Sequence, residues 1–153
     1  MANLVQRESL ERYHLAERFA EAVQRHPERA CLTFGLRRLS YAQVDEEAAA
    51  LAAVLSDFGI ERGDRVAVDL PNLPEWIVTL LATVRLGGVL VPVDPSVSYH
   101  ELKYQLRHAE ISLVVAAESV GDAESLDLFD ELNEPSRSPV FDHGGWRRSL
   151  VRR

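Results

Sequence analysis

The sequence contains almost no cysteine and almost no lysine. Cys31 and Lys103 are the single representatives of their residue types among 153 residues. A single cysteine excludes an internal disulfide, and such usage is typical of a protein in the reducing cytoplasm. Because Cys31 lies beside Leu32 in an apolar context, we expect it to behave as a small buried hydrophobic residue instead of a reactive thiol.

Long apolar runs and a surplus of positive charge are also missing. No stretch of about 18 apolar residues exists, so we expect no transmembrane segment. The first residues mix charges without an apolar core, which argues against a secretory signal. A formal net charge of -7 argues against nucleic-acid binding, while 46% hydrophobic and 27% charged residues are typical of one soluble globular domain.

Histidines are present, but they do not stand at metal-binding spacings. No two of them lie four residues apart on a predicted helix, so we expect no metal site. His143 precedes a Gly-Gly pair in the manner of an oxyanion loop, but no Gly-x-Ser-x-Gly nucleophile elbow accompanies it. The five histidines are His14, His26, His100, His108 and His143.

The N-terminal part predicts a helix followed by a hairpin. Apolar residues recur at helical spacing over residues 7–25. Pro27 ends this helix, because the residue before a proline is pushed out of the α region. Residues 30–34 and 37–39 predict two strands joined by a turn at Gly35.

A capping box begins the next predicted helix. Ser40 and Gln43 have the Ser-x-x-Gln pattern, in which each side chain bonds the other residue's backbone N–H. We expect this helix to run to about Asp57 and to be followed by Gly59, a suitable C′ residue. Its predicted buried stripe comprises Val44, Ala48, Leu51, Ala52 and Leu55.

Three short strands then alternate with two helices. The predicted strands, residues 65–70, 89–93 and 111–116, are apolar on both faces, and the predicted helices cover residues 74–86 and 99–108. Buried strands that alternate with helices indicate an α/β fold with a mainly parallel sheet between flanking helices, in three layers. We expect all three strands to lie in the interior of the sheet.

The C-terminal part of the sequence has a different character. We predict a first unit over residues 1–118, a short helix or linker over residues 119–132, and a flexible basic tail over residues 133–153. A short amphipathic helix is predicted over residues 125–132. The tail shows no periodicity, and prolines and glycines interrupt it, so we expect no regular structure there.

Three loop motifs are candidates for chemistry. Gly87-Gly88 follows a helix and precedes a strand, whereas phosphate loops run from strand to helix, so this pair predicts a helix C-cap and tight turn. Gly63-Asp64 predicts a β-turn that feeds a strand. Residues 94–96 (Asp-Pro-Ser) follow a strand, at the edge where α/β sheets bind ligands. They either border a ligand site or only shape the loop before the next helix.

Four segments carry a resemblance to a known family. They are LSYAQV (39–44), GDRVAV (63–68), LPNLPEW (70–76) and LGGVLVPVDP (86–95). In this order and spacing they resemble the opening subdomain of the adenylate-forming (AMP-binding) enzymes, which include acyl-CoA synthetases, luciferases and peptide-synthetase adenylation domains. The resemblance covers residues 32–117 and is closest to acyl-CoA synthetases and fatty-acid–CoA ligases. The family motif usually has Lys-Ala-Gly where this chain has Arg85-Leu86-Gly87.

The resemblance implies an AMP-forming ligase. Such enzymes join a carboxylate to AMP with Mg-ATP and then transfer the acyl group to a thiol, often that of coenzyme A. The family's ATP-handling motifs are absent here, so no catalytic, cofactor-binding or metal-binding residue of the family can be assigned to any position of this sequence. ATP, Mg and coenzyme A are implied for a complete member, and no cofactor for this chain alone.

We therefore expect an N-terminal fragment of an acyl-CoA synthetase-like enzyme of fatty acid metabolism, truncated before the ATP-binding motifs and not catalytic alone. Two alternatives stay open: a non-enzymatic interaction module derived from this subdomain, or an independent flavodoxin-like ligand-binding domain. The latter needs a phosphate loop, for which residues 94–98 are the candidate, with a proline and no glycine. The expected partners are the missing remainder of the enzyme or a second copy, bound through an apolar docking face. The expected compartment is the cytoplasm.

Overall fold

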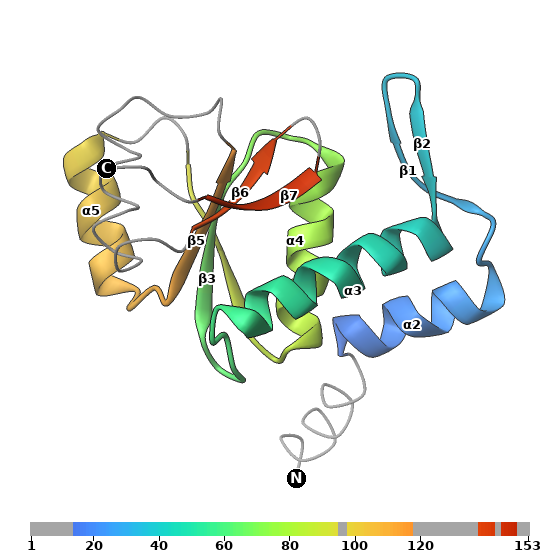
Figure 1. Ribbon diagram of the computed structural model, residues 1–153, viewed down its shortest axis with the longest axis horizontal. Helices are drawn as coiled ribbons and strands as arrows, with labels where there is room; N and C mark the ends of the chain where they lie inside the picture. The colour runs from blue at the N-terminus through green and yellow to red at the C-terminus, as the bar shows by residue number, and fades with distance from the viewer. Residues whose placement is uncertain (1–13, 95–97, 118–137, 143–144, 150–153) are drawn as a thin grey trace, which may run out of the picture.

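Two βαβ units form the centre of the molecule (Figure 1). Strands β3 (Arg65–Asp69), β4 (Val89–Pro92) and β5 (Leu113–Ala117) are joined by helices α4 (Pro74–Arg85) and α5 (Tyr99–His108). These elements confirm the predicted strands and helices, with small differences at their ends. The computed structural model describes residues 14–94, 98–117, 138–142 and 145–149.

The strand order places β3 between the other two parallel strands. Val66 of β3 lies opposite Leu90 of β4 on one side and Leu113 of β5 on the other. The complete order is β4-β3-β5-β6-β7, so β4 is an edge strand. The expectation that all three parallel strands lie in the interior is therefore wrong for β4. β4 is apolar in sequence but only partly buried, with Val89 49% exposed, so apolar composition alone does not identify the edge.

Two further strands extend the sheet beyond β5. β6 (Ser138–Asp142) pairs with β5 in parallel, and β7 (Gly145–Ser149) pairs with β6 in antiparallel orientation. The expectation of no regular structure over residues 133–153 is wrong for these two segments. Pro139 and the neighbouring charged residues are unusual in a strand, which explains why no strand was expected. The helix predicted at residues 125–132 lies outside the described residues, and the division of the chain at residues 118 and 132 stays a prediction.

Side chains of the parallel strands alternate between the two faces of the sheet. Val66 and Val68 of β3 pack in one apolar cluster with α3 (Tyr41–Asp57) and α4. Ala67, which lies between them, packs in a second cluster with Leu102 of α5. The sheet is therefore the middle of three layers, as predicted, with α3 and α4 on one face and α5 on the other (Figure 1). The predicted stripe of α3 is buried at all its positions.

Local caps determine where the helices begin and end. The Ser40 hydroxyl accepts from the Gln43 N–H at 3.2 Å, and the Gln43 side chain accepts from the Ser40 N–H at 2.9 Å, which confirms the predicted capping box. Ser98 and Glu101 form a second box at the start of α5. There the backbone N–H and hydroxyl of Ser98 donate to the Glu101 carboxylate and lower its pKa. Gly59 follows the C-cap of α3 with φ 86°, a conformation that glycine adopts without strain.

An α-helix and a separate hairpin form the N-terminal part. Helix α2 (Leu15–Arg25) packs beside α3, where the rings of Phe19 and Tyr41 have centroids 5.8 Å apart. Strands β1 (Ala30–Phe34) and β2 (Arg37–Ser40) pair in antiparallel orientation as a two-stranded sheet of their own. The predicted helix and hairpin are confirmed here, while residues 7–13 of the predicted helix lie outside the described part.

Replacing Ser40 with alanine is expected to lower the free energy of unfolding by about 1 kcal/mol, because the Gln43 N–H loses its partner at the start of α3. Ser56→Ala, near the end of the same helix, makes the same chemical change without removing an N-cap. We expect a change of less than about 0.5 kcal/mol there. Urea denaturation followed by circular dichroism measures both variants, and equal losses would contradict a capping role for Ser40.

Candidate functional site

The Gly87-Gly88 pair ends α4 and turns the chain into β4. The N–H of Gly88 donates to the Thr83 carbonyl, and the N–H of Gly87 to the Val84 carbonyl, each at 3.0 Å. These are the two bonds of a Schellman motif. A Cβ at Gly88 would lie 3.2 Å from the carbonyl oxygens of Asp64 and Thr83, so a larger residue would require these neighbours to shift. The prediction of a helix C-cap and tight turn is confirmed, because both amides bond helix carbonyls and are not free to hold a phosphate.

Gly63-Asp64 organises a loop at the same edge of the sheet, where the parallel strands begin. The Asp64 carboxylate accepts from the Glu61 N–H at 2.7 Å and from the Ser112 hydroxyl at 3.3 Å. Its backbone carbonyl accepts from the Val89 N–H at 2.8 Å, next to β4. Asp64 thus ties together the loops that precede all three parallel strands, which agrees with the predicted role of this pair as a turn.

The opposite edge, where the parallel strands end, is the usual ligand-binding edge of open α/β sheets. Asp94 follows β4 at this edge and is exposed. The rest of the predicted motif, residues 95 and 96, lies outside the described residues. Whether this loop borders a ligand or only shapes the start of α5 therefore stays a prediction.

Asp69 is a buried carboxylate at this carboxyl edge that the sequence analysis did not single out. It ends β3 opposite Ala116 of β5, and it is 7% exposed. Because side chains alternate along a strand, Asp69 lies on the same face as Ala67, the face covered by α5. Burial raises the pKa of its carboxyl group. A signal was present in the sequence, since Asp69 interrupts the apolar run of residues 66–70.

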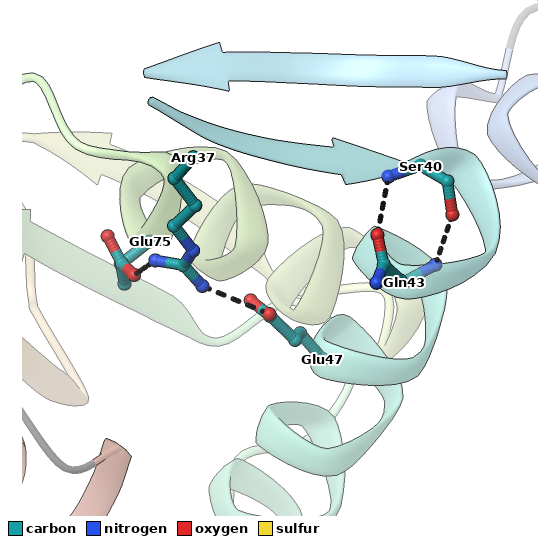
Figure 2. A network of polar contacts seen from close by, with 5 residues as sticks. All are labelled: Arg37, Ser40, Gln43, Glu47 and Glu75. Carbon is teal, nitrogen blue, oxygen red and sulfur yellow. Dashed lines mark hydrogen bonds and ion pairs between the residues drawn. The ribbon is translucent and has the colours of Figure 1, made fainter. Parts of the chain in front are cut away.

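A cluster of three charged side chains, Arg37, Glu47 and Glu75, joins three elements that are distant in the sequence (Figure 2). Arg37 of β2 donates to Glu75 of α4 at 2.5 Å and to Glu47 of α3 at 3.1 Å. The side chain of Glu75 is 4% exposed, and that of Arg37 is 45% exposed. The hydrogen bond with Glu75 raises the pKa of Arg37, so the guanidinium stays charged. The cluster neutralises a buried carboxylate and fixes the hairpin on the two helices.

Three further side chains, those of Trp76, Ile77 and Cys31, pack against the apolar core. Trp76 and Ile77 of α4 are partly buried against the core. Cys31 is half-buried, and burial raises the pKa of its thiol, as expected of a small hydrophobic residue.

Within the described ranges, no group of three or more His, Cys, Asp and Glu side chains could hold a metal ion. No helix in that part of the chain is long and apolar enough to cross a membrane.

The described residues do not fit a nucleoside triphosphate. The charged groups that end β3 and follow β4 at the carboxyl edge are Asp69 and Asp94, and carboxylates repel phosphate oxygens. Phosphate sites of α/β folds place glycine amides between a strand and the start of a helix. No glycine in the described segments has that position, since those with left-handed φ lie in the hairpin turn, after helices or in the turn before β3.

Comparisons with known proteins identify the family. The sequence profile of the family described as AMP-binding enzyme matches residues 19–151. The chain belongs to the AMP-binding enzyme family. A long-chain-fatty-acid–CoA ligase of Bacillus subtilis (strain 168) is 35% identical to it over 95 residues. Syringomycin synthase SyrB1 of Pseudomonas syringae pv. syringae is 36% identical over 118 residues.

This chain spans a small share of the length of its relatives. The alignments cover 62% of the chain and 17% of the Bacillus ligase, and 77% of the chain and 18% of the Pseudomonas synthase. The solved structure of coronafacic acid ligase from Pectobacterium brasiliense matches with a TM-score of 0.78 at 19% identity, over 86% of this chain and 26% of that one. The predicted α/β fold of the family is thus confirmed.

Replacing Asp69 with asparagine is expected to raise the melting temperature of the chain by a few degrees at neutral pH. Because burial raises the carboxyl pKa, the folded state binds the proton more tightly than the unfolded state does. The contribution of this carboxyl group to stability is therefore full below its unfolded-state pKa and is lost as the pH rises through its folded-state pKa. The advantage of the variant should vanish in acid, below the ordinary carboxyl range.

Thermal unfolding over a series of pH values measures this effect of Asp69. Glu46→Gln is the control, because it removes an exposed carboxyl group on α3. We expect no comparable pH dependence for the control. An Asp69→Asn variant that is less stable than the native chain at neutral pH would show that the ionised carboxylate makes a stabilising contact, contrary to the prediction.

Replacing Arg37 with methionine is expected to lower the free energy of unfolding by about 1–3 kcal/mol, because Glu75 stays buried without its charged donor. Adding Glu75→Gln to this variant should restore part of the loss, since a neutral amide needs no cation. Glu47→Gln alone should cost less than about 1 kcal/mol, because that ion pair is more exposed. Denaturant unfolding of the native chain, the two single variants and the double variant measures these free energies. Equal losses for Arg37→Met and Glu47→Gln would refute the predicted order.

Proposed function

We propose that this chain forms the N-terminal structural part of an ATP-dependent, AMP-forming acyl-CoA ligase-like enzyme and does not catalyse adenylation alone. The proposal rests on the contrast between the length of the family match and the lack of a phosphate loop in its described part. The family match extends over residues 19–151, yet the described part of that stretch has no loop suited to phosphate. The chain also corresponds to only 17% of the Bacillus ligase, so most residues of such an enzyme have no counterpart in it.

The physical reason for the non-catalytic part of the proposal is electrostatic. Adenylation develops charge around the phosphates, and each oriented donor contributes about 3 kcal/mol at such a transition state. The carboxylates of Asp69 and Asp94 are the wrong groups for that task. We propose that ATP, Mg and coenzyme A are held by other residues of the complete enzyme. The chain then acts as a scaffold, which packs beside a second subdomain and helps to wall the acyl and thiol region.

The proposed substrate class follows from the named relatives. The name of the Bacillus relative specifies a long-chain fatty acid and coenzyme A. We propose the same class, a carboxylic acid of fatty acid metabolism transferred to a thiol, for the enzyme to which this chain contributes. We propose the cytoplasm as its compartment, because the one thiol of the sequence, Cys31, is half-buried and requires no oxidising environment.

The purified chain is expected to show no magnesium-dependent exchange of pyrophosphate into ATP with carboxylic acids of short to long chain length. The reason is that the charged groups of Asp69 and Asp94 are carboxylates, which repel phosphate oxygens. Exchange of labelled pyrophosphate measures this, with the complete Bacillus ligase as the positive control. Exchange above the buffer blank by the chain alone would overturn the non-catalytic part of the proposal.

A chimera tests the structural part of the same prediction. Residues 19–151 of this chain, which match the family profile, replace the stretch of the Bacillus ligase that corresponds to the same part of the profile. We expect the chimera to fold and to retain exchange activity, whereas the ligase without that stretch should lose it. A folded chimera without exchange would count against the proposed structural equivalence.

A further inference from the structure

The β1–β2 hairpin projects from the body of the molecule (Figure 1). The side chains at its tip are apolar. Gly35 makes the tight turn with φ 57°, and two large side chains flank it. Leu36 is 105% exposed, and Phe34 is 49% exposed. Single exposed apolar side chains are ordinary on protein surfaces. Here two large ones flank a single glycine at the end of a protruding element.

The base of the hairpin is fixed, although its tip is exposed. Leu39 of β2 is buried in the main apolar cluster, and Leu32 of β1 packs partly buried against it. The Tyr41 N–H donates to the Arg29 carbonyl at 3.0 Å where the hairpin meets α3. Arg37, next to Leu36, is held by Glu47 and Glu75 (Figure 2).

This rigidity distinguishes the hairpin from a loose loop. An isolated two-stranded hairpin is at best marginally stable in water, so this one depends on its contacts with α3 and α4. Those contacts hold Phe34 and Leu36 in a defined direction. Binding of a pre-ordered element loses little conformational entropy, so such a tip is suited to insertion into a pocket.

This chain corresponds to only a small part of each relative, and the remaining part of such an enzyme is the candidate partner of the tip. The structural match makes up 26% of coronafacic acid ligase and the sequence alignment 17% of the Bacillus ligase, so most of each enzyme lies outside the matched stretch. A second copy of this chain is a poorer candidate, because each copy carries a net charge of -7 and two copies repel each other.

We propose that Phe34 and Leu36 insert into an apolar pocket on the part of an AMP-binding enzyme that lies outside the stretch matched by this chain. That part is either joined to this chain or supplied as a separate one. The inference rests on the proposed function, because it requires the chain to serve as one structural part of such an enzyme. It adds the residues at which the two parts meet.

Thiol labelling of the chimera described above tests the inference. Leu36→Cys is introduced in a Cys31→Ser background, in the free chain and in the chimera. We expect the cysteine at position 36 to react at least about tenfold more slowly in the chimera, because docking buries it. Tyr104→Cys is the control, since Tyr104 is also largely exposed but lies on α5. Its labelling rate should be similar in both proteins.

A charge variant gives a second readout that does not depend on labelling. Leu36→Asp should leave the melting temperature of the free chain unchanged, because the side chain is fully exposed there. The same change should lower the melting temperature of the chimera by several degrees, whereas Tyr104→Asp should not.

The outcomes separate this inference from the proposed function. A folded and active chimera in which position 36 reacts as fast as in the free chain overturns the docking inference and leaves the proposed function standing. Labelling of the free chain that slows with its concentration, together with dimers in sedimentation, shows a second copy to be the occupant and also overturns it. A chimera that does not fold counts against both.

Discussion

The structure depends on the burial of β3 between two strands and two layers of helices. Val66, Ala67 and Val68 are almost completely inaccessible to solvent. The backbone of β3 pairs with β4 on one side and with β5 on the other, which satisfies its buried N–H and C=O groups. Helices α3 and α4 on one face and α5 on the other all obtain their apolar contacts from this region. The glycine turn after α4 and the loop at Asp64 then hold the start of β4 against it.

Polar interactions outside this core position the N-terminal hairpin. Glu75 lies in the first turn of α4, where a negative charge is favourable to the helix dipole, and α4 packs on the sheet. Its ion pair with Arg37 therefore relates the hairpin to the core through one buried carboxylate. The hairpin is also held at its base by apolar contacts of Leu32 and Leu39. This arrangement makes the exposed tip a rigid extension of the domain.

The two ends of the parallel strands differ in chemistry, and this difference bears on function. The amino ends are closed by glycine turns and by the side-chain bonds of Asp64, which are structural. The carboxyl ends present carboxylates, one of them buried. Neither end resembles a phosphate site within the described residues. This difference supports the proposal that the chain contributes shape and contact surface to an enzyme of the AMP-binding family, and that other residues are responsible for the adenylation chemistry.

Local structure was determined by the sequence itself, because its causes lie within a few residues. The capping box at Ser40, the C′ glycine at Gly59 and the Gly87-Gly88 turn each depend on neighbours within one helical turn. The three two-sided apolar strands and their parallel pairing also followed from local pattern. Only the tertiary structure decided that β4 lies at the edge, that β6 and β7 extend the sheet, that Asp69 is buried, and that Arg37 meets Glu75. These features depend on which distant segments meet in space, and such meetings leave no periodic signal along the chain.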